Sequence, residues 1–210
     1  MKGSGYRNTI IEALWNRALA LRTFLLKGKI GPLGLGSTRK EVEDVVGIFD
    51  SYEETPAGFL GVFNGDKPNI QFYFTYDERL RNFHVSTDVL YYSERKKPKT
   101  ENLLRMLFSD FHLFYQPPAY YLEQVLNEGI RLFYVEKMSE PEFGLGHYYI
   151  TERNVKFFLS PRLHETIPGA TLFYIGCSNN LLEEIAAYEG IEVTTGNIKL
   201  PSDLVGIKRY

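Results

Sequence analysis

The first part of the chain repeats apolar residues with the period of an α-helix. Leu14, Leu21 and Leu25 fall on one side of such a helix, and Gly28 is a typical residue for its end. Arg17 and Arg22 flank this apolar stripe, which favours a packed structural helix over a membrane-surface or transit-type helix. The pattern therefore predicts a buried helix over residues 7–27.

A second helix follows a glycine-rich extended segment at residues 30–36. Thr38 and Glu41 have the spacing of a capping box, and Val42 and Val45 form an apolar edge. Gly47 favours a left-handed exit. We expect a two-turn helix that begins after Thr38 and ends at Gly47.

Residues 58–87 alternate in the manner of strands. Runs at 58–63, 70–76 and 80–87 are separated by turn-forming residues and predict an antiparallel meander. Phe72, Phe74 and Tyr76 fall on one face of the middle run, and Tyr73 falls on the other. One covered face is typical of such a sheet.

The second half repeats the order helix, helix, meander. Helical spacing recurs over 103–111 and from Pro118 to Gly129, and again over 179–189, where Leu182 is expected to face inward. Strand-like runs occupy 130–135, 147–150, 155–159, 171–175 and 191–195. The sequence predicts an α+β fold with a mainly antiparallel sheet, built from two halves, 1–93 and 100–210, joined by an exposed connector at 94–99.

Composition and charge limit the classes of function that are possible for this chain. The chain has 210 residues, of which 44% are hydrophobic, and a formal net charge of −2, so it can bury a core and has no strongly basic surface for nucleic acid. Cys177 is the single cysteine, which excludes an internal disulfide. The chain shows neither an export signal nor a membrane-spanning run, and we expect a cytoplasmic protein.

The run from Ile30 through the capped helix to Gly47, followed by the Phe-rich meander, resembles the opening of small uncharacterised bacterial proteins, some of them thought to be toxin-immunity proteins. It is also similar to the helix-helix-meander unit of β-lactamase inhibitor proteins and of a small outer-membrane assembly lipoprotein. The resemblance covers residues 30–87, and Ile48 and Phe49 stand where a proline is usual. It implies an α+β fold and binding to another protein, and the expected absence of a lipidated cysteine favours the intracellular relatives.

The sequence motifs that could bind a cofactor or a metal each lack a required residue or spacing. The glycines at 31–36 are followed by Ser37 where a phosphate loop needs lysine, so a tight turn and helix cap are favoured. The four histidines show no zinc-ligand spacing. We expect no cofactor and no metal.

Two hypotheses for function remain open. The leading one is a protein-binding module, such as an immunity or inhibitor protein that binds a toxin or enzyme, because tyrosines are abundant and suit interfaces. Its expected binding residues are Tyr73, Tyr91, Tyr92, Tyr120, Tyr121, Tyr148 and Tyr149. The alternative is a small cysteine-dependent enzyme. In it Cys177 lies at a strand-to-helix turn, the backbone N-H groups of Asn179 and Asn180 lower its pKa and hold developing negative charge, and one histidine is the base.

Overall fold

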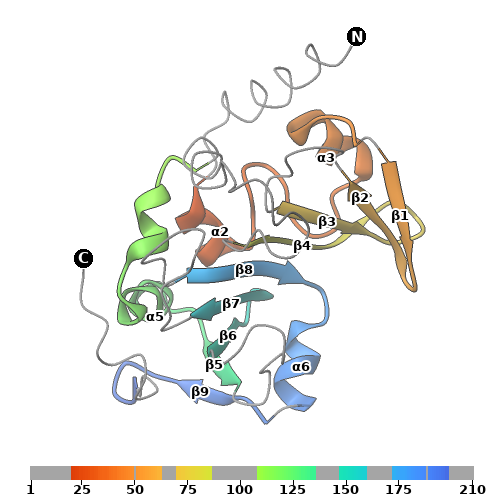
Figure 1. Ribbon diagram of the computed structural model, residues 1–210. Helices are drawn as coiled ribbons and strands as arrows, with labels where there is room; N and C mark the ends of the chain where they lie inside the picture. The colour runs from red at the N-terminus through yellow and green to blue at the C-terminus, as the bar shows by residue number, and fades with distance from the viewer. Residues whose placement is uncertain are drawn as a thin grey trace, which may run out of the picture.

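The computed structural model describes residues 20–49, 51–62, 70–86, 108–135, 147–159, 172–187 and 189–198. Across these residues the protein is an α+β fold whose sheet is antiparallel throughout, as expected from the sequence (Figure 1). The predicted connector at 94–99 and the predicted helical residues 103–107 lie outside the described residues, so the division into 1–93 and 100–210 stays a prediction.

A single sheet of nine strands runs through the described residues in the order β1-β2-β3-β4-β8-β7-β6-β5-β9. The first half contributes β1 (Ser51–Thr55), β2 (Gly58–Val62), β3 (Ile70–Phe74) and β4 (Leu80–Ser86). The second half contributes β5 (Leu132–Val135), β6 (His147–Thr151), β7 (Val155–Leu159), β8 (Leu172–Ser178) and β9 (Ile191–Val193). The two predicted meanders are thus one sheet, joined where β4 pairs with β8.

Capping residues, a glycine and a proline mark the ends of the helices. Helix α2 (Leu21–Lys27) closes at Gly28, whose φ of 61° is left-handed. Helix α3 (Arg39–Val46) has the predicted capping box, because the Thr38 side chain accepts from the Glu41 backbone N-H and the Glu41 carboxylate accepts from the Thr38 N-H. Helix α5 (Pro118–Asn127) begins on a proline.

One face of the sheet carries the main core. Side chains from α2, α3, α5 and the short 3₁₀ helix η1 (Phe111–Tyr115) belong to the same buried cluster as those of the sheet. Phe24 of α2, for example, stacks on Phe83 of β4 with ring centroids 5.0 Å apart. Figure 1 shows α3 beside β2 and β3, and α2 beside β4 and β8.

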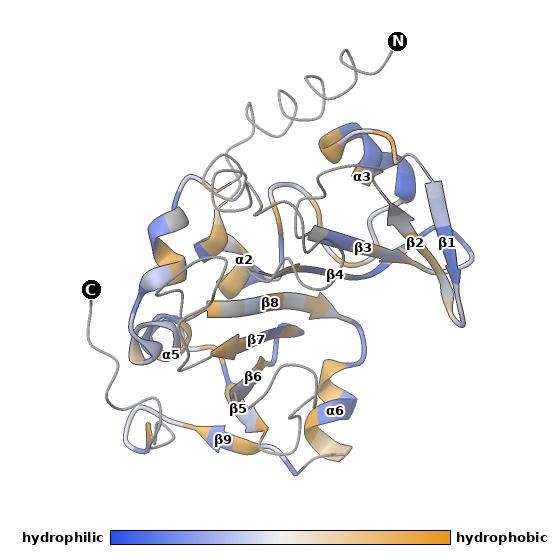
Figure 2. Cartoon of the chain, in the orientation of Figure 1, coloured by the Kyte–Doolittle hydropathy of each residue, from blue (hydrophilic) through white to orange (hydrophobic). Residues whose placement is uncertain are grey.

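The opposite face is covered differently along its length. Helix α6 (Leu181–Ala187) packs Leu181 and Ile185 against Val135 and Ile150, so it covers the β5–β6 end of this face. Leu182 was expected to face inward but is 48% exposed, because α6 turns only a narrow stripe to the sheet. The hydropathy colouring in Figure 2 shows this mixture of apolar and polar residues along α6.

The first meander departs from the sequence-based expectation in two places. Tyr76 is 62% exposed rather than on the covered face, because β3 ends at Phe74 and the register shifts between Tyr73 and Phe74. The polar run Ser51–Thr55, which no strand pattern indicated, forms the edge strand β1 and pairs with β2 along all five residues.

Candidate functional site

The face of the sheet opposite the main core carries an organised set of polar and aromatic side chains. The register pairs His84 of β4 with Gly176 of β8, and Gly176 in turn with Lys156 of β7. Paired residues of neighbouring strands point to the same side, so His84 and Lys156 face the same way, away from the buried Phe83 and Phe157. We call the side chains of Tyr73, His84, Lys156 and Tyr174 the outer-face cluster.

Three rings of this cluster form a row across β3, β4 and β8. The His84 ring lies 6.0 Å from the Tyr73 ring at 30° and 5.0 Å from the Tyr174 ring at 34°, measured between centroids. All three side chains are half-buried. No described helix packs apolar side chains on this row, because α2, α3 and α5 share the opposite core and α6 lies on β5 and β6.

Gly176 makes room for the row. A Cβ at this position would lie 2.5 Å from the Tyr174 hydroxyl and 3.0 Å from the Cβ of His84. The Tyr174 ring therefore leans along its own strand and lies over Gly176. A larger residue would push Tyr174 away from His84.

His84 is held in its neutral form. Its Nδ1 is buried and has no hydrogen-bond partner among the described residues. Burial, with a smaller contribution from the positive charge of Lys156, lowers the pKa of His84 to about 4. At neutral pH the imidazole is therefore uncharged and serves as a flat, weakly polar ring.

Lys156 is anchored by two contacts on the same face. Its Nζ lies 4.9 Å from the centroid of the Tyr148 ring and 3.5 Å from Oε2 of Glu184 in α6. The Lys156 side chain is only 12% exposed, so α6 neutralises a largely buried cation. These two contacts fix the position of the lysine side chain on this face.

The predicted binding tyrosines separate into four groups. Tyr73 lies in the outer-face cluster as expected, with its hydroxyl donating to Oε1 of Gln71 at 2.7 Å. Burial, and secondarily Glu53, raises the pKa of Tyr73. Tyr120 is half-buried against Tyr121. Tyr91 and Tyr92 lie outside the described residues.

The other three tyrosines are not exposed, which corrects the expectation. Tyr121 is fully buried and donates its hydroxyl hydrogen to the Leu113 carbonyl, and Tyr149 is 1% exposed in the main core. Tyr148 is 5% exposed and packs against Phe158. Adjacent tyrosines on a strand must face opposite sides, and here both sides are covered.

Cys177 lies within β8 rather than in the turn that follows it. It is 2% exposed and faces the main core, where its Sγ would lie 3.1 Å from a Cβ built on Gly28. Burial raises the pKa of Cys177 to about 12, opposite to the lowering that a nucleophile requires. The predicted placement beside the backbone N-H groups of α6 is therefore wrong, since the side chain points to the other face.

The glycine-rich segment has a structural use. Gly31 and Gly36 have φ values of 59° and 84°, and Ile30 pairs with Leu33 in a tight turn. The Gly36 N-H donates to the Leu80 carbonyl at 2.7 Å, and the Leu80 N-H to the Ser37 carbonyl. This binds the segment to the start of β4. Within the described residues, no three His, Cys, Asp or Glu side chains converge to hold a metal ion.

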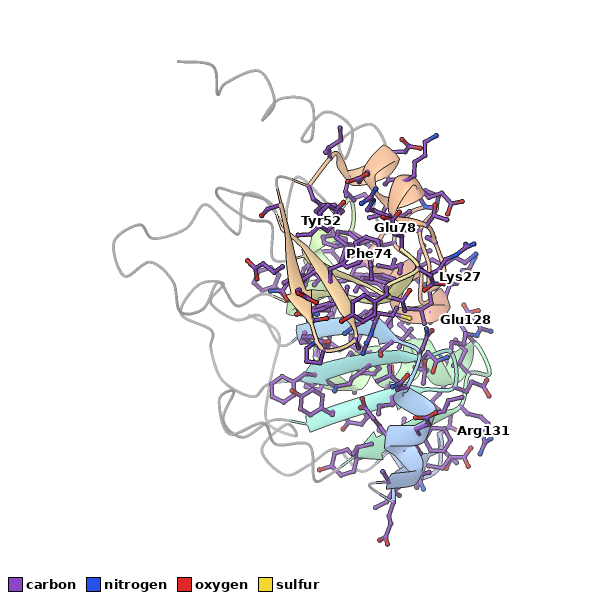
Figure 3. The ribbon with its side chains drawn as sticks, turned by 90° about the vertical axis from the view of Figure 1, so that its right-hand side faces the viewer. Lys27, Tyr52, Phe74, Glu78, Glu128 and Arg131 are labelled. Carbon is purple, nitrogen blue, oxygen red and sulfur yellow. The ribbon has the colours of Figure 1, made fainter. Side chains whose placement is uncertain are left out.

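A polar cluster fixes the edge strand β1 to α3. Tyr52 donates to Oε1 of Glu43, and the Arg39 guanidinium lies 5.3 Å from the centroid of the Tyr52 ring. Arg39 also pairs with Glu78 at 3.0 Å. Burial, and then Glu43, raises the pKa of Tyr52. Figure 3 shows Tyr52 and Glu78 on this upper part of the molecule, with Glu128 near the middle of the view and Arg131 well below them.

Sequence reasoning missed the residues that organise the outer-face cluster. His84 was recognised only as one of four histidines without zinc-ligand spacing, and no sequence pattern singled out Glu184. The alternation of Phe83, His84 and Val85 does indicate that His84 points away from the core. Its proximity to Lys156 depends on the pairing of β4, β8 and β7, which no local pattern predicts.

Comparison with known proteins gives no assignment. No family model matches the chain, and no curated protein matches it. Among solved structures, a 1.5 Å crystal structure of an extracellular protein containing an SCP domain from Bacillus anthracis str. Ames aligns with a TM-score of 0.40 and 12% identity. The alignment covers 82% of this chain and 52% of that protein, so the chain spans about half of its length. This likeness supports no inference about fold or function. No helix in the described parts of the chain is long and apolar enough to span a membrane.

Proposed function

We propose that this chain is a protein-binding module of the immunity or inhibitor type, that it acts in the cytoplasm, and that its outer-face cluster contacts the partner. The observation that carries the proposal is the row of Tyr73, His84 and Tyr174 on a part of the sheet that no described helix covers. Rigid aromatic side chains give large contact area with little loss of rotamer freedom, which suits interfaces.

The state of His84 supports recognition rather than catalysis. An acid-base histidine has a pKa near the working pH, whereas burial keeps His84 neutral with a pKa of about 4. Lys156 is paired with Glu184, and the Cys177 thiol faces the opposite side of the sheet. The similarity of residues 30–87 to immunity-like and inhibitor proteins points the same way, and the outer-face cluster includes Tyr73 from that segment.

A capture experiment tests the proposal. The tagged full chain is used as bait in cells of its source organism, and a recovered partner is then purified and its dissociation constant measured by calorimetry. Tyr73→Ala is expected to weaken binding by about tenfold or more, as for an aromatic interface residue. Leu182→Ala is the matched control, because Leu182 is exposed on α6 away from the cluster. Equal affinities for wild type and Tyr73→Ala contradict the role of the cluster, and turnover of a small molecule by the lone chain contradicts the proposed function.

A further inference from the structure

Strand β1 is the outer strand of the sheet on the side of the first half. It pairs with β2 alone among the described strands, so alternate backbone N-H and C=O groups of Ser51–Thr55 face away from the sheet. Figure 1 shows β1 at the margin of the ribbon with no described element beyond it. These groups are arranged to pair with a further strand.

Two of the exposed large apolar side chains lie near the two ends of β1. Ile48, three residues before the strand, is 68% exposed. Tyr76 is 62% exposed, and its hydroxyl donates to the carbonyl of Thr55 at 3.2 Å, so its ring lies beside the far end of the strand. An edge that only avoids pairing has no need of apolar side chains there.

The centre of β1 is acidic. Glu53 and Glu54 are both exposed, and neither has an ion pair among the described residues. The register places Glu53 opposite Leu60 and Glu54 opposite Phe59, so the two carboxylates lie on opposite faces of the sheet. The Tyr52 contacts with Glu43 and Arg39 hold the strand against α3 and keep this edge in place.

We infer that β1 is a site of strand addition for an extended segment of the partner protein, with two adjacent cationic residues at its centre and apolar residues at its ends. This inference rests on the proposed function and specifies which residue types the binding segment of the partner contains. Main-chain hydrogen bonds to β1 would provide affinity, and lysine or arginine opposite Glu53 and Glu54 would provide specificity.

The same charges disfavour a second copy of this chain as the occupant. In an antiparallel pair of two β1 strands centred on Glu53 or on Glu54, that glutamate of one copy would stand opposite the same residue of the other, and like charges directly opposite each other are destabilising. A basic segment removes this repulsion. Charge complementarity therefore selects a different protein rather than self-association.

The test uses the full-length chain labelled with ¹⁵N and two synthetic peptides. The basic peptide is acetyl-Ile-Thr-Lys-Lys-Thr-Val-amide, and the acidic peptide replaces both lysines with glutamate. Titration followed by amide chemical shifts should show changes concentrated at residues 51–55 with the basic peptide. Its affinity should exceed that of the acidic peptide by roughly tenfold, as expected for two cross-strand charge pairs. In the variant Glu53→Lys/Glu54→Lys this preference should invert.

The matched control is Glu123→Lys/Glu183→Lys, which makes the same change in charge at exposed helix positions and should leave the preference unchanged. Equal effects of the two peptides, or shifts that map to Tyr73 and His84 instead of β1, overturn the inference. So does the absence of any shift, which is the result expected if the glutamates serve only to block pairing. Failure of the proposed function is measured separately from failure of this inference. It is tested by capture of the natural partner and by the weaker binding of that partner to Tyr73→Ala.

Discussion

Protonation of His84 should destabilise the fold in mildly acidic solution. The pKa of a histidine is about 6.5 in the unfolded chain and about 4 for His84 in the folded one. Between these values the unfolded state binds the proton and the folded state does not, so stability is complete above pH 6.5 and is lost as the pH falls towards 4. The difference between 6.5 and 4 corresponds to at most about 3 kcal/mol of unfolding free energy.

The physical origin of this penalty lies in what surrounds the ring. Tyr73 and Tyr174 lie on its two sides, Nδ1 has no partner among the described residues, and Lys156 adds positive charge on the same face. Glu184 partly compensates because it pairs with Lys156. A second positive charge at His84 would therefore be poorly solvated and would repel Lys156.

The assay compares the wild type with His84→Gln. Urea unfolding followed by circular dichroism gives the free energy of unfolding of each protein from pH 7.5 to pH 4. Loss of the ring lowers the stability of His84→Gln by a similar amount at every pH, and carboxylates elsewhere titrate in both proteins. Neither effect therefore changes how the difference in unfolding free energy between the two proteins varies with pH. The wild type should lose more stability than the variant between pH 7 and pH 4, by up to about 3 kcal/mol. Parallel curves, or an NMR titration of His84 with a pKa near 6.5, would refute the reasoning.

Two further predictions concern β8. Iodoacetamide should modify Cys177 at pH 8 at least about a hundredfold more slowly in the folded protein than in 6 M urea, because the thiol is 2% exposed and its pKa is raised to about 12. A fast reaction of the folded protein with an apparent pKa below 8.5 would instead support the hypothesis of a cysteine-dependent enzyme. Gly176→Ala should lower the free energy of unfolding by about 1–3 kcal/mol, because the new Cβ would meet Tyr174 and His84. Gly196→Ala, where no atom lies within 4 Å, is the control and should be close to neutral in urea unfolding.

The parts of the fold that local chemistry determines could be predicted from the sequence. The capping box at Thr38 and Glu41, the helix end at Gly28 and the strand over Val155–Leu159 each depend on residues within one turn or one strand. The 3.6-residue and two-residue periods are properties of the same short segments. These predictions are confirmed at nearly the expected residues.

The parts set by distant pairing could not be predicted. Strand β1 has two glutamates and little strand propensity, and it is stabilised by β2 and by Tyr52 with α3. β8 extends to Ser178 because it pairs with β4 on one side and β7 on the other. The burial of Tyr121 and Tyr149 likewise depends on which surfaces are covered, and composition does not reveal this.

The junction of β4 with β8 explains why the outer-face cluster belongs to neither half alone. His84 comes from the first half and Gly176, Tyr174 and Lys156 from the second, and the pair of His84 with Gly176 lies in the middle of that junction. The contact between His84 and Tyr174 therefore exists only when the two halves share the sheet. Because the same pairing buries Phe83 against Phe24 on the other face, loosening the junction would lose core packing as well as the cluster. The proposed binding face is thus coupled to the stability of the junction, so acid conditions that charge His84 should weaken partner binding together with the fold.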